Sequence, residues 1–247
     1  EKIFMFNFSF DKRTMYIIVG IMLLFVVIQY AANPTQLIGL LISAPGVLIA
    51  ITFHEFAHGY AAYKLGDDTA KNQGRLSLNP FAHLDPIGSI MLIFAGFGWG
   101  KPVEIDSRNF NRNIKMPVAE AMVAAAGPIM NFILAIIFAV IYAIIWKFAP
   151  TFMVNQIGFI IMLMIQSCIA INLGLGIFNL IPLPPLDGSK IVMGFLPYNA
   201  KNWVQQYEQY FYIAFVVIWV TGIAGIIISP LISGAYTGLM KLVCSMF

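Results

Sequence analysis

The motif HEFAH at residues 54–58 holds the residue types and spacing of a metal-dependent hydrolase. Residues four apart on a helix lie on nearly the same face, about 6 Å along the axis, so His54 and His58 can each place one imidazole nitrogen on a single ion. A catalytic Zn²⁺ ion takes three protein ligands and leaves a position for water, and a nearby carboxylate accepts a proton from that water. The spacing therefore predicts a zinc site with Glu55 as general base and then as proton donor to the leaving amine.

A third ligand must come from another segment, and the candidates are His83, the only other histidine, and acidic residues near a membrane helix. The best source is the stretch NLIPLPPLDGSK at residues 179–190. Its prolines end a helix, because they lack a backbone donor and clash with the preceding turn, and they leave extended chain that carries Asp187. Gly188 is expected to permit a tight turn. The alternative is that Asp187 caps a following short helix.

The elements that must position these residues are apolar. Of the 247 residues, 60% are hydrophobic and 10% are charged, and the mean hydropathy is +0.84. A soluble domain has about 25% charged residues, so we expect an integral membrane protein. Apolar segments recur along almost the whole chain, which leaves no room for a separate soluble domain and predicts one membrane-embedded unit over 1–247. Cys168 and Cys244 lie alone in apolar runs and are interpreted as buried hydrophobic residues.

The predicted fold is an all-α polytopic membrane protein. Apolar runs predict six helices, with the first kept as a true span rather than a cleaved signal peptide, at residues 15–32, 36–64, 117–147, 153–181, 208–229 and 231–246. The polar stretch 66–115 separates the second and third helices and contains a short glycine-rich apolar piece, residues 86–99, which is typical of a re-entrant or hairpin segment. The catalytic core is predicted over about 36–197, flanked by the first helix and the last two.

The net charge of +3 comes from basic residues that cluster in loops beside the predicted spans, so it indicates orientation in a membrane and not binding to nucleic acid. Three regions hold twelve of the fourteen: Lys2, Lys12 and Arg13; Lys64, Lys71, Arg75, Lys101, Arg108, Arg112 and Lys115; Lys190 and Lys201. Six crossings put all three regions on one side. We expect a multi-pass protein of the cell membrane, with its amino terminus and active-site side in the cytoplasm.

Three motifs in order, HEFAH, AAGPIMNF at residues 125–132 and NLIPLPPLDG, give the chain a resemblance to the site-2 protease family of intramembrane zinc metalloproteases, in its short form without a PDZ domain. Order and spacing agree across residues 45–197. The resemblance implies one Zn²⁺ per chain on His54, His58 and Asp187, and a water activated by Glu55. It also implies a transmembrane protein or peptide substrate, cut within or near the bilayer.

The resemblance also implies that Asn131 positions the substrate or stabilises the oxyanion, as an amide donor can. A plain hydrogen bond between helices is the alternative for this intramembrane asparagine. Asn179 could bind the extended substrate backbone or satisfy carbonyls freed by Pro182. His83, with Asp85, could orient a ligand or shape the substrate entrance, or could simply anchor a loop by hydrogen bonds.

The region 66–115 resembles the membrane-associated hairpin of that family, with GRLSLNP at residues 74–80 and KPVEID at residues 101–106 as short strands near the site. A substrate strand could add to their exposed edge, and the alternative is a simple cytoplasmic loop. The flanking helices could form a gate or could only pack against lipid. The sequence does not predict the substrate, the cut position or the oligomeric state.

Two functions fit these residues. The first is a zinc-dependent endopeptidase that cleaves transmembrane segments of membrane-protein substrates, as in regulated intramembrane proteolysis. The second is a non-enzymatic membrane carrier or sensor of zinc, since intramembrane His and Asp also mark ion pathways. Transporters often show inverted repeats and broken helices in both halves, and the sequence shows no such repeat. The endopeptidase is therefore the favoured prediction.

Overall fold

The structure, a computed structural model, describes residues 30–86, 88, 89, 98 and 100–246, together with Leu24 and Ile28. Most of the predicted first helix (15–32) and most of the apolar piece at 86–99 lie outside the described residues. Both remain predictions.

The described residues are helical wherever they are regular, and four helices are long and apolar enough to cross a membrane. These four are α2 (Pro34–Lys64), α5 (Met116–Phe148), α7 (Gln156–Asn179) and α11 (Ile223–Cys244). The shorter α-helices are α3 (Thr69–Asn72), α6 (Pro150–Val154), α8 (Asp187–Phe195), α9 (Tyr198–Gln206) and α10 (Glu208–Val220), and there are two 3₁₀ turns, η1 (Pro80–Ala82) and η2 (Ser107–Asn109).

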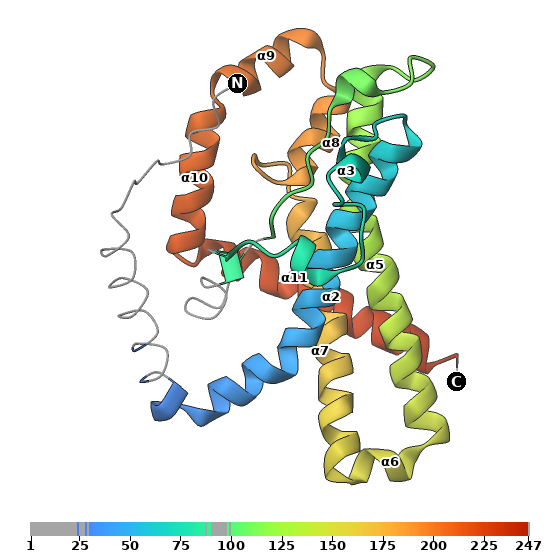
Figure 1. The fold of residues 1–247 in the computed structure, drawn as a ribbon. Helices are drawn as coiled ribbons and strands as arrows, with labels where there is room; N and C mark the ends of the chain where they lie inside the picture. The colour runs from blue at the N-terminus through green and yellow to red at the C-terminus, as the bar shows by residue number, and fades with distance from the viewer. Residues whose placement is uncertain are drawn as a thin grey trace.

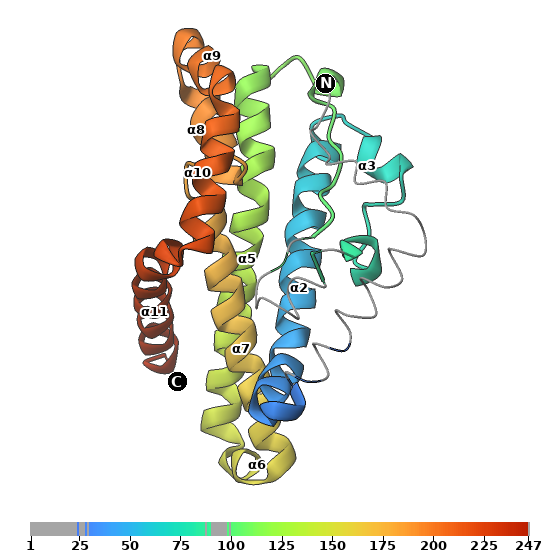
Figure 2. The same cartoon turned by 90° about the vertical axis from the view of Figure 1, so that its left-hand side faces the viewer.

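The long helices α2, α5 and α7 run side by side and form the centre of the molecule, with α10 and α11 on one flank (Figures 1 and 2). Small side chains allow this close packing: Ala135, Ala139 and Ala143 line one face of α5 at four-residue spacing. They pack against larger residues of α7, among them Ile169, which is fully buried. In a bilayer, lipid is as apolar as leucine, so close van der Waals packing of small residues is what holds such helices together.

Two helix ends differ in how well they were predicted. The prolines after Asn179 were expected to end the fourth helix, and α7 does end at Asn179. The predicted boundary near residue 230 is wrong, because α10 ends at Val220 and Pro230 lies inside α11. The chain turns instead at Gly222, whose φ of 77° is in the left-handed region that glycine adopts without strain.

The two predicted strands between α2 and α5 are wrong, since neither 74–80 nor 101–106 forms a strand. Their nearest feature is an isolated antiparallel bridge between Leu84 and Gly100. Part of the reason is that side chains bond to backbone groups of 101–106 that a neighbouring strand would otherwise use. Arg75 donates to Lys101 O at 2.6 Å, and Val103 N donates to a carboxylate oxygen of Glu55 at 2.9 Å.

The two ends of the helical bundle differ in charge. α3, α8 and α9 lie toward one end, and α6 connects α5 to α7 at the other (Figures 1 and 2). Lys71, Lys190 and Lys201 lie on α3, α8 and α9, whereas Lys147 lies in the last turn of α5, next to α6. These three lysines therefore lie on elements at the end opposite α6.

Candidate metal centre

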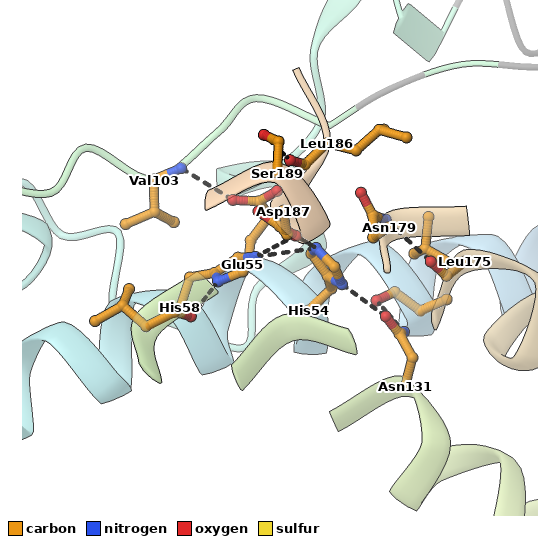
Figure 3. Close-up of polar contacts among 12 residues, drawn as sticks. His54, Glu55, His58, Val103, Asn131, Leu175, Asn179, Leu186, Asp187 and Ser189 are labelled. Atoms are coloured by element: carbon orange, nitrogen blue, oxygen red, sulfur yellow. Dashed lines mark hydrogen bonds and ion pairs between the residues drawn. The ribbon is translucent and has the colours of Figure 1, made fainter. Parts of the chain in front are cut away.

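Three buried side chains from two distant segments meet between α2 and the start of α8. His54 Nε2 and His58 Nε2 lie 3.0 Å apart, and each lies 3.1 Å from Asp187 Oδ2 (Figure 3). Helical spacing places both imidazoles on one face of α2, and the turn after α7 delivers Asp187 as the first residue of α8. The structure thus brings together the three predicted ligands.

The outer nitrogens of the two rings determine what faces the centre. His58 Nδ1 lies 2.8 Å from Val123 O, a carbonyl that can only accept, so Nδ1 carries the proton. His54 Nδ1 lies 2.6 Å from Asn131 Oδ1, which likewise accepts. Both Nε2 atoms therefore present lone pairs toward Asp187. With both rings neutral, no proton lies between His54 Nε2, His58 Nε2 and Asp187 Oδ2, so hydrogen bonds do not hold these three atoms together.

A divalent cation fits this arrangement. Ligand atoms about 2.0–2.1 Å from one tetrahedral Zn²⁺ ion lie roughly 3.3 Å from each other, close to the separations found here. Two imidazoles and one carboxylate are also a donor set of catalytic zinc sites. On chemistry and spacing, the described residues can hold one zinc ion.

Gly127 and Gly188 are glycines because a side chain at either position would collide with neighbouring atoms. Sequence spacing does not predict this. A Cβ on Gly127 of α5 would lie 2.7 Å from His54 Nε2 and nearer still to His58 Nε2. A Cβ on Gly188 would collide with the carbonyl oxygens of Leu180 and Ile181. Gly188 was expected in a tight turn but lies in the first turn of α8. The position needs glycine because there is no space for a Cβ, and not because of an unusual backbone φ.

Glu55 lines a cavity of about 510 Å³, and the three clustered residues line the same cavity. The carboxylate is half-buried, and its Oε2 accepts the backbone N–H of Val103. The cavity walls come from the loop before α5, from α5 itself and from α8 and α9, and they include Lys190 and Lys201. A carboxylate fixed on one oxygen beside a metal cluster in an open cavity is arranged to exchange protons with a ligand.

Asn131 is fully buried and lies on the Nδ1 side of the His54 ring, away from the cluster (Figure 3). Its amide nitrogen donates to Ala50 O at 3.1 Å and to Asn172 Oδ1 at 3.0 Å. Both amide hydrogens are therefore used. In this arrangement Asn131 has no donor for an oxyanion or a substrate, and the geometry favours the alternative, a hydrogen bond between helices, here with a ligand histidine as partner.

The other predicted site residues lie outside the cluster. Asn179 lines the cavity but donates to Leu175 O of its own helix at 3.0 Å. His83 is fully buried, and its Nε2 donates to Ser77 O at 2.7 Å, as expected of a loop anchor. Asp85 accepts from Gly88 N at 2.7 Å, within the same loop.

Asp67, just after α2, is a structural residue that the sequence interpretation missed. It is fully buried, and its carboxylate accepts from Asp106 N at 2.8 Å and from Asn109 Nδ2 at 2.9 Å, as well as from Thr69. Burial alone would raise the pKa of Asp67, but these donors outweigh it and hold the pKa below its usual value. Asp67 thereby ties the end of α2 to the loop that carries Val103.

Comparisons with known proteins agree on one family. The sequence profile described as Peptidase family M50 matches residues 43–222, a range that contains the whole cluster. A protein of Bacillus subtilis named "Putative zinc metalloprotease YwhC" is 38% identical over 201 residues, covering 81% of this chain and 90% of that protein. One of Mycolicibacterium smegmatis named "Putative zinc metalloprotease Rip2" is 26% identical over 196 residues, covering 76% of this chain and 71% of that protein. No solved structure matches the chain significantly.

Proposed function

The chain belongs to peptidase family M50, the site-2 protease family of metalloproteases, and from this premise we propose that it is an endopeptidase that cuts transmembrane segments of other membrane proteins. The observation that carries the proposal is the convergence of His54, His58 and Asp187 beside Glu55, in a cavity at a membrane-span helix. The names of both relatives include zinc, and the donor set suits that ion.

The three clustered residues are proposed as the ligands of one zinc ion. The hydrogen bonds of both Nδ1 atoms orient the rings and leave Nε2 free to coordinate, as the outer partners of ligand histidines do in zinc sites. Asp187 adds a negative charge that offsets part of the charge of the cation. When bound, the ion supplies the Lewis acidity that activates a water molecule and a peptide carbonyl.

Glu55 is proposed as the residue that moves the proton. Its carboxylate takes a proton from the attacking water as the water oxygen forms a bond to the carbonyl carbon of the substrate. It then gives that proton to the amide nitrogen as the C–N bond breaks, so one water is consumed and an amine and a carboxylic acid are released. The Val103 N–H holds one carboxylate oxygen in place during both transfers.

The substrate is proposed to be a membrane-spanning segment because of where the cluster lies. His54 and His58 belong to a helix that is apolar enough to cross a bilayer. Ionisable groups at such depth are costly and normally face an interior or a wet cavity that uses them. We also propose a multi-pass location in the cell membrane with the basic end in the cytoplasm, supported by the clustering of Lys and Arg near α3, α8 and α9.

The test replaces Glu55 with Gln, which keeps the shape of the side chain and removes its basicity. Each form of the protein is co-expressed with a panel of transmembrane helices tagged at both ends. The wild type is expected to separate the tags of at least one helix, and the Glu55→Gln variant is expected to retain zinc and to cut none. Equal cleavage by the variant would refute the role of Glu55, and zinc uptake into vesicles without any cleavage would favour a carrier.

A further inference from the structure

Two buried amides and an imidazole connect three helices behind the three clustered residues. Asn172 of α7 and Asn131 of α5 are both fully buried, and they are joined by a hydrogen bond of 3.0 Å from Asn131 Nδ2 to Asn172 Oδ1. Asn131 in turn contacts His54 of α2. Buried polar groups are costly unless every one is paired, so a connected run of them inside an apolar bundle needs a reason.

The direction of this chain of hydrogen bonds is determined at its far end. Asn172 Nδ2 donates to Cys168 O, one turn back in α7, at 2.8 Å. A carbonyl can only accept, so the other end of the amide, Oδ1, must face Asn131. Asn131 therefore turns its NH₂ group toward α7, and its Oδ1 toward His54.

This orientation decides which nitrogen of His54 holds the proton. With Oδ1 of Asn131 as its neighbour, His54 Nδ1 must be protonated, which leaves Nε2 with a lone pair toward the cluster. A reversed Asn131 amide would instead present N–H groups to Nδ1. It would then favour protonation of Nε2, and a protonated Nε2 cannot bind a metal.

We propose that Asn172 is a positioning residue for the metal centre: through Asn131 it holds His54 in the tautomer that can coordinate zinc. The inference rests on the proposed function, since it takes His54 as a zinc ligand. Asn172 touches neither the cluster nor the cavity, so its effect is on the affinity for the ion. Ala50 O also orients Asn131, so loss of Asn172 alone should weaken zinc binding about 10-fold, the lower end of the range for outer partners of metal ligands.

Two substitutions of similar size separate positioning from packing. Asn172→Asp keeps an oxygen that accepts from Asn131, and when protonated it can also donate to Cys168 O. Asn172→Leu keeps the volume but removes the acceptor. Positioning predicts near wild-type zinc affinity for the Asp variant and about 10-fold weaker affinity for the Leu variant. A packing role predicts the opposite order, because leucine suits an apolar interior better than a carboxyl group.

The readout is the zinc dissociation constant of each purified full-length protein, from competition with a chelator, together with the visible absorption spectrum of the Co²⁺ form. Gln166→Leu is the matched control. Gln166 also joins α7 to α5 through a side-chain hydrogen bond, to Tyr142 Oη at 3.0 Å, but it does not contact Asn131. Its variant should bind zinc as the wild type does. If Asn172→Leu does not fold, Asn172→Ala removes the same acceptor without adding bulk.

The outcomes are distinct. Weaker zinc binding and an altered Co²⁺ spectrum in the Leu or Ala variant, with both near wild type in the Asp variant, support the inference. Equal affinity in all variants, or a loss confined to the Asp variant, overturns the inference but leaves the proposed function standing. A wild-type protein that binds no zinc overturns the proposed function and the inference with it.

Discussion

At the scale of single residues, the meeting of His54, His58 and Asp187 was predictable, and the hydrogen bonds that hold their side chains in place were not. Helical spacing predicts His54, Glu55 and His58 as site residues. The prolines before Asp187 predict that it lies in extended chain and can reach them. The function of Asn131 depends on which groups surround its amide, and those come from α2 and α7, far away in sequence. Spacing along one chain holds no information on such contacts.

Gly127 allows a test of the cluster that changes no proposed ligand. In Gly127→Ala the added methyl group would lie against both Nε2 atoms, so the rings must separate. We expect zinc affinity to fall at least 10-fold, as for damage to the surroundings of other zinc sites. The measurement is metal content after dialysis against a weak chelator. Gly234→Ala in α11, where an added Cβ meets no atom within 4 Å, is the control and should keep its zinc.

The hydrogen bond from Val103 N to Glu55 can be removed through the backbone. Val103→Pro deletes the N–H donor, while Val103→Ala keeps it and shortens the side chain. Because one oxygen of Glu55 loses its hydrogen bond, we expect kcat to fall about tenfold in the Pro variant. This is smaller than the whole contribution of a positioned general base, because Glu55 itself stays in place. Zinc content should stay unchanged. Equal kcat in the Pro and Ala variants would show that this donor does not position Glu55.

At the scale of elements, the apolar runs predicted the long helices, and failures came where side chains determine the backbone. The strands at 74–80 and 101–106 were expected from the family resemblance, but the side chains of Arg75 and Glu55 take backbone groups of 101–106 as partners. The turn at Gly222 was missed because Pro230 is a stronger signal in sequence. A proline inside a long apolar helix is tolerated when neighbouring helices support it.

Asp67 makes the loop before α5 sensitive to pH. A carboxyl group with a lowered pKa in the folded state contributes its full stabilisation above its ordinary pKa and loses it as the pH falls through the lowered value. Asp67→Asn should therefore cost about 2 kcal/mol at pH 7, the size of a hydrogen bond to a charged group, and less at low pH. Thermal unfolding in detergent at pH 7 and at about pH 2, below the ordinary pKa of an aspartate, measures this difference.

The neighbouring residue provides the control for that measurement. Asp68 is exposed and pairs with Lys71 at 3.7 Å, an arrangement that contributes little to stability. Asp68→Asn should leave the melting temperature nearly unchanged at both pH values. If Asp67→Asn also has no effect at pH 7, the carboxylate does not hold the loop.

At the scale of the whole molecule, composition predicted a membrane protein and charge predicted its orientation. The fold adds that α3, α8 and α9, which carry Lys71, Lys190 and Lys201, lie toward one end of the bundle and α6 lies at the other (Figure 2). The packing of the helices around the three clustered residues could not be predicted from the sequence. The helices are all apolar, and the periodicity of apolar residues does not indicate which faces contact each other.

Labelling from one side of the membrane tests the orientation. In a chain with Cys244→Ser, so that only the buried Cys168 remains, a new cysteine is placed at the exposed Asp68 near α3 or at the exposed Thr151 in α6. A membrane-impermeant maleimide added to intact cells should label the Thr151→Cys chain and not the Asp68→Cys chain. The reverse pattern would place the basic end outside the cell.

The most direct test of the central claim follows the reaction itself. The purified wild-type chain is incubated in H₂¹⁸O with a transmembrane helix that it cuts, and the products are weighed by mass spectrometry. We predict one ¹⁸O atom in the new carboxyl terminus, a cut within the membrane-spanning segment, and no product from the Glu55→Gln variant although it retains zinc. Product formation by that variant at the wild-type rate, or no hydrolysis by the zinc-loaded wild type, would contradict the account.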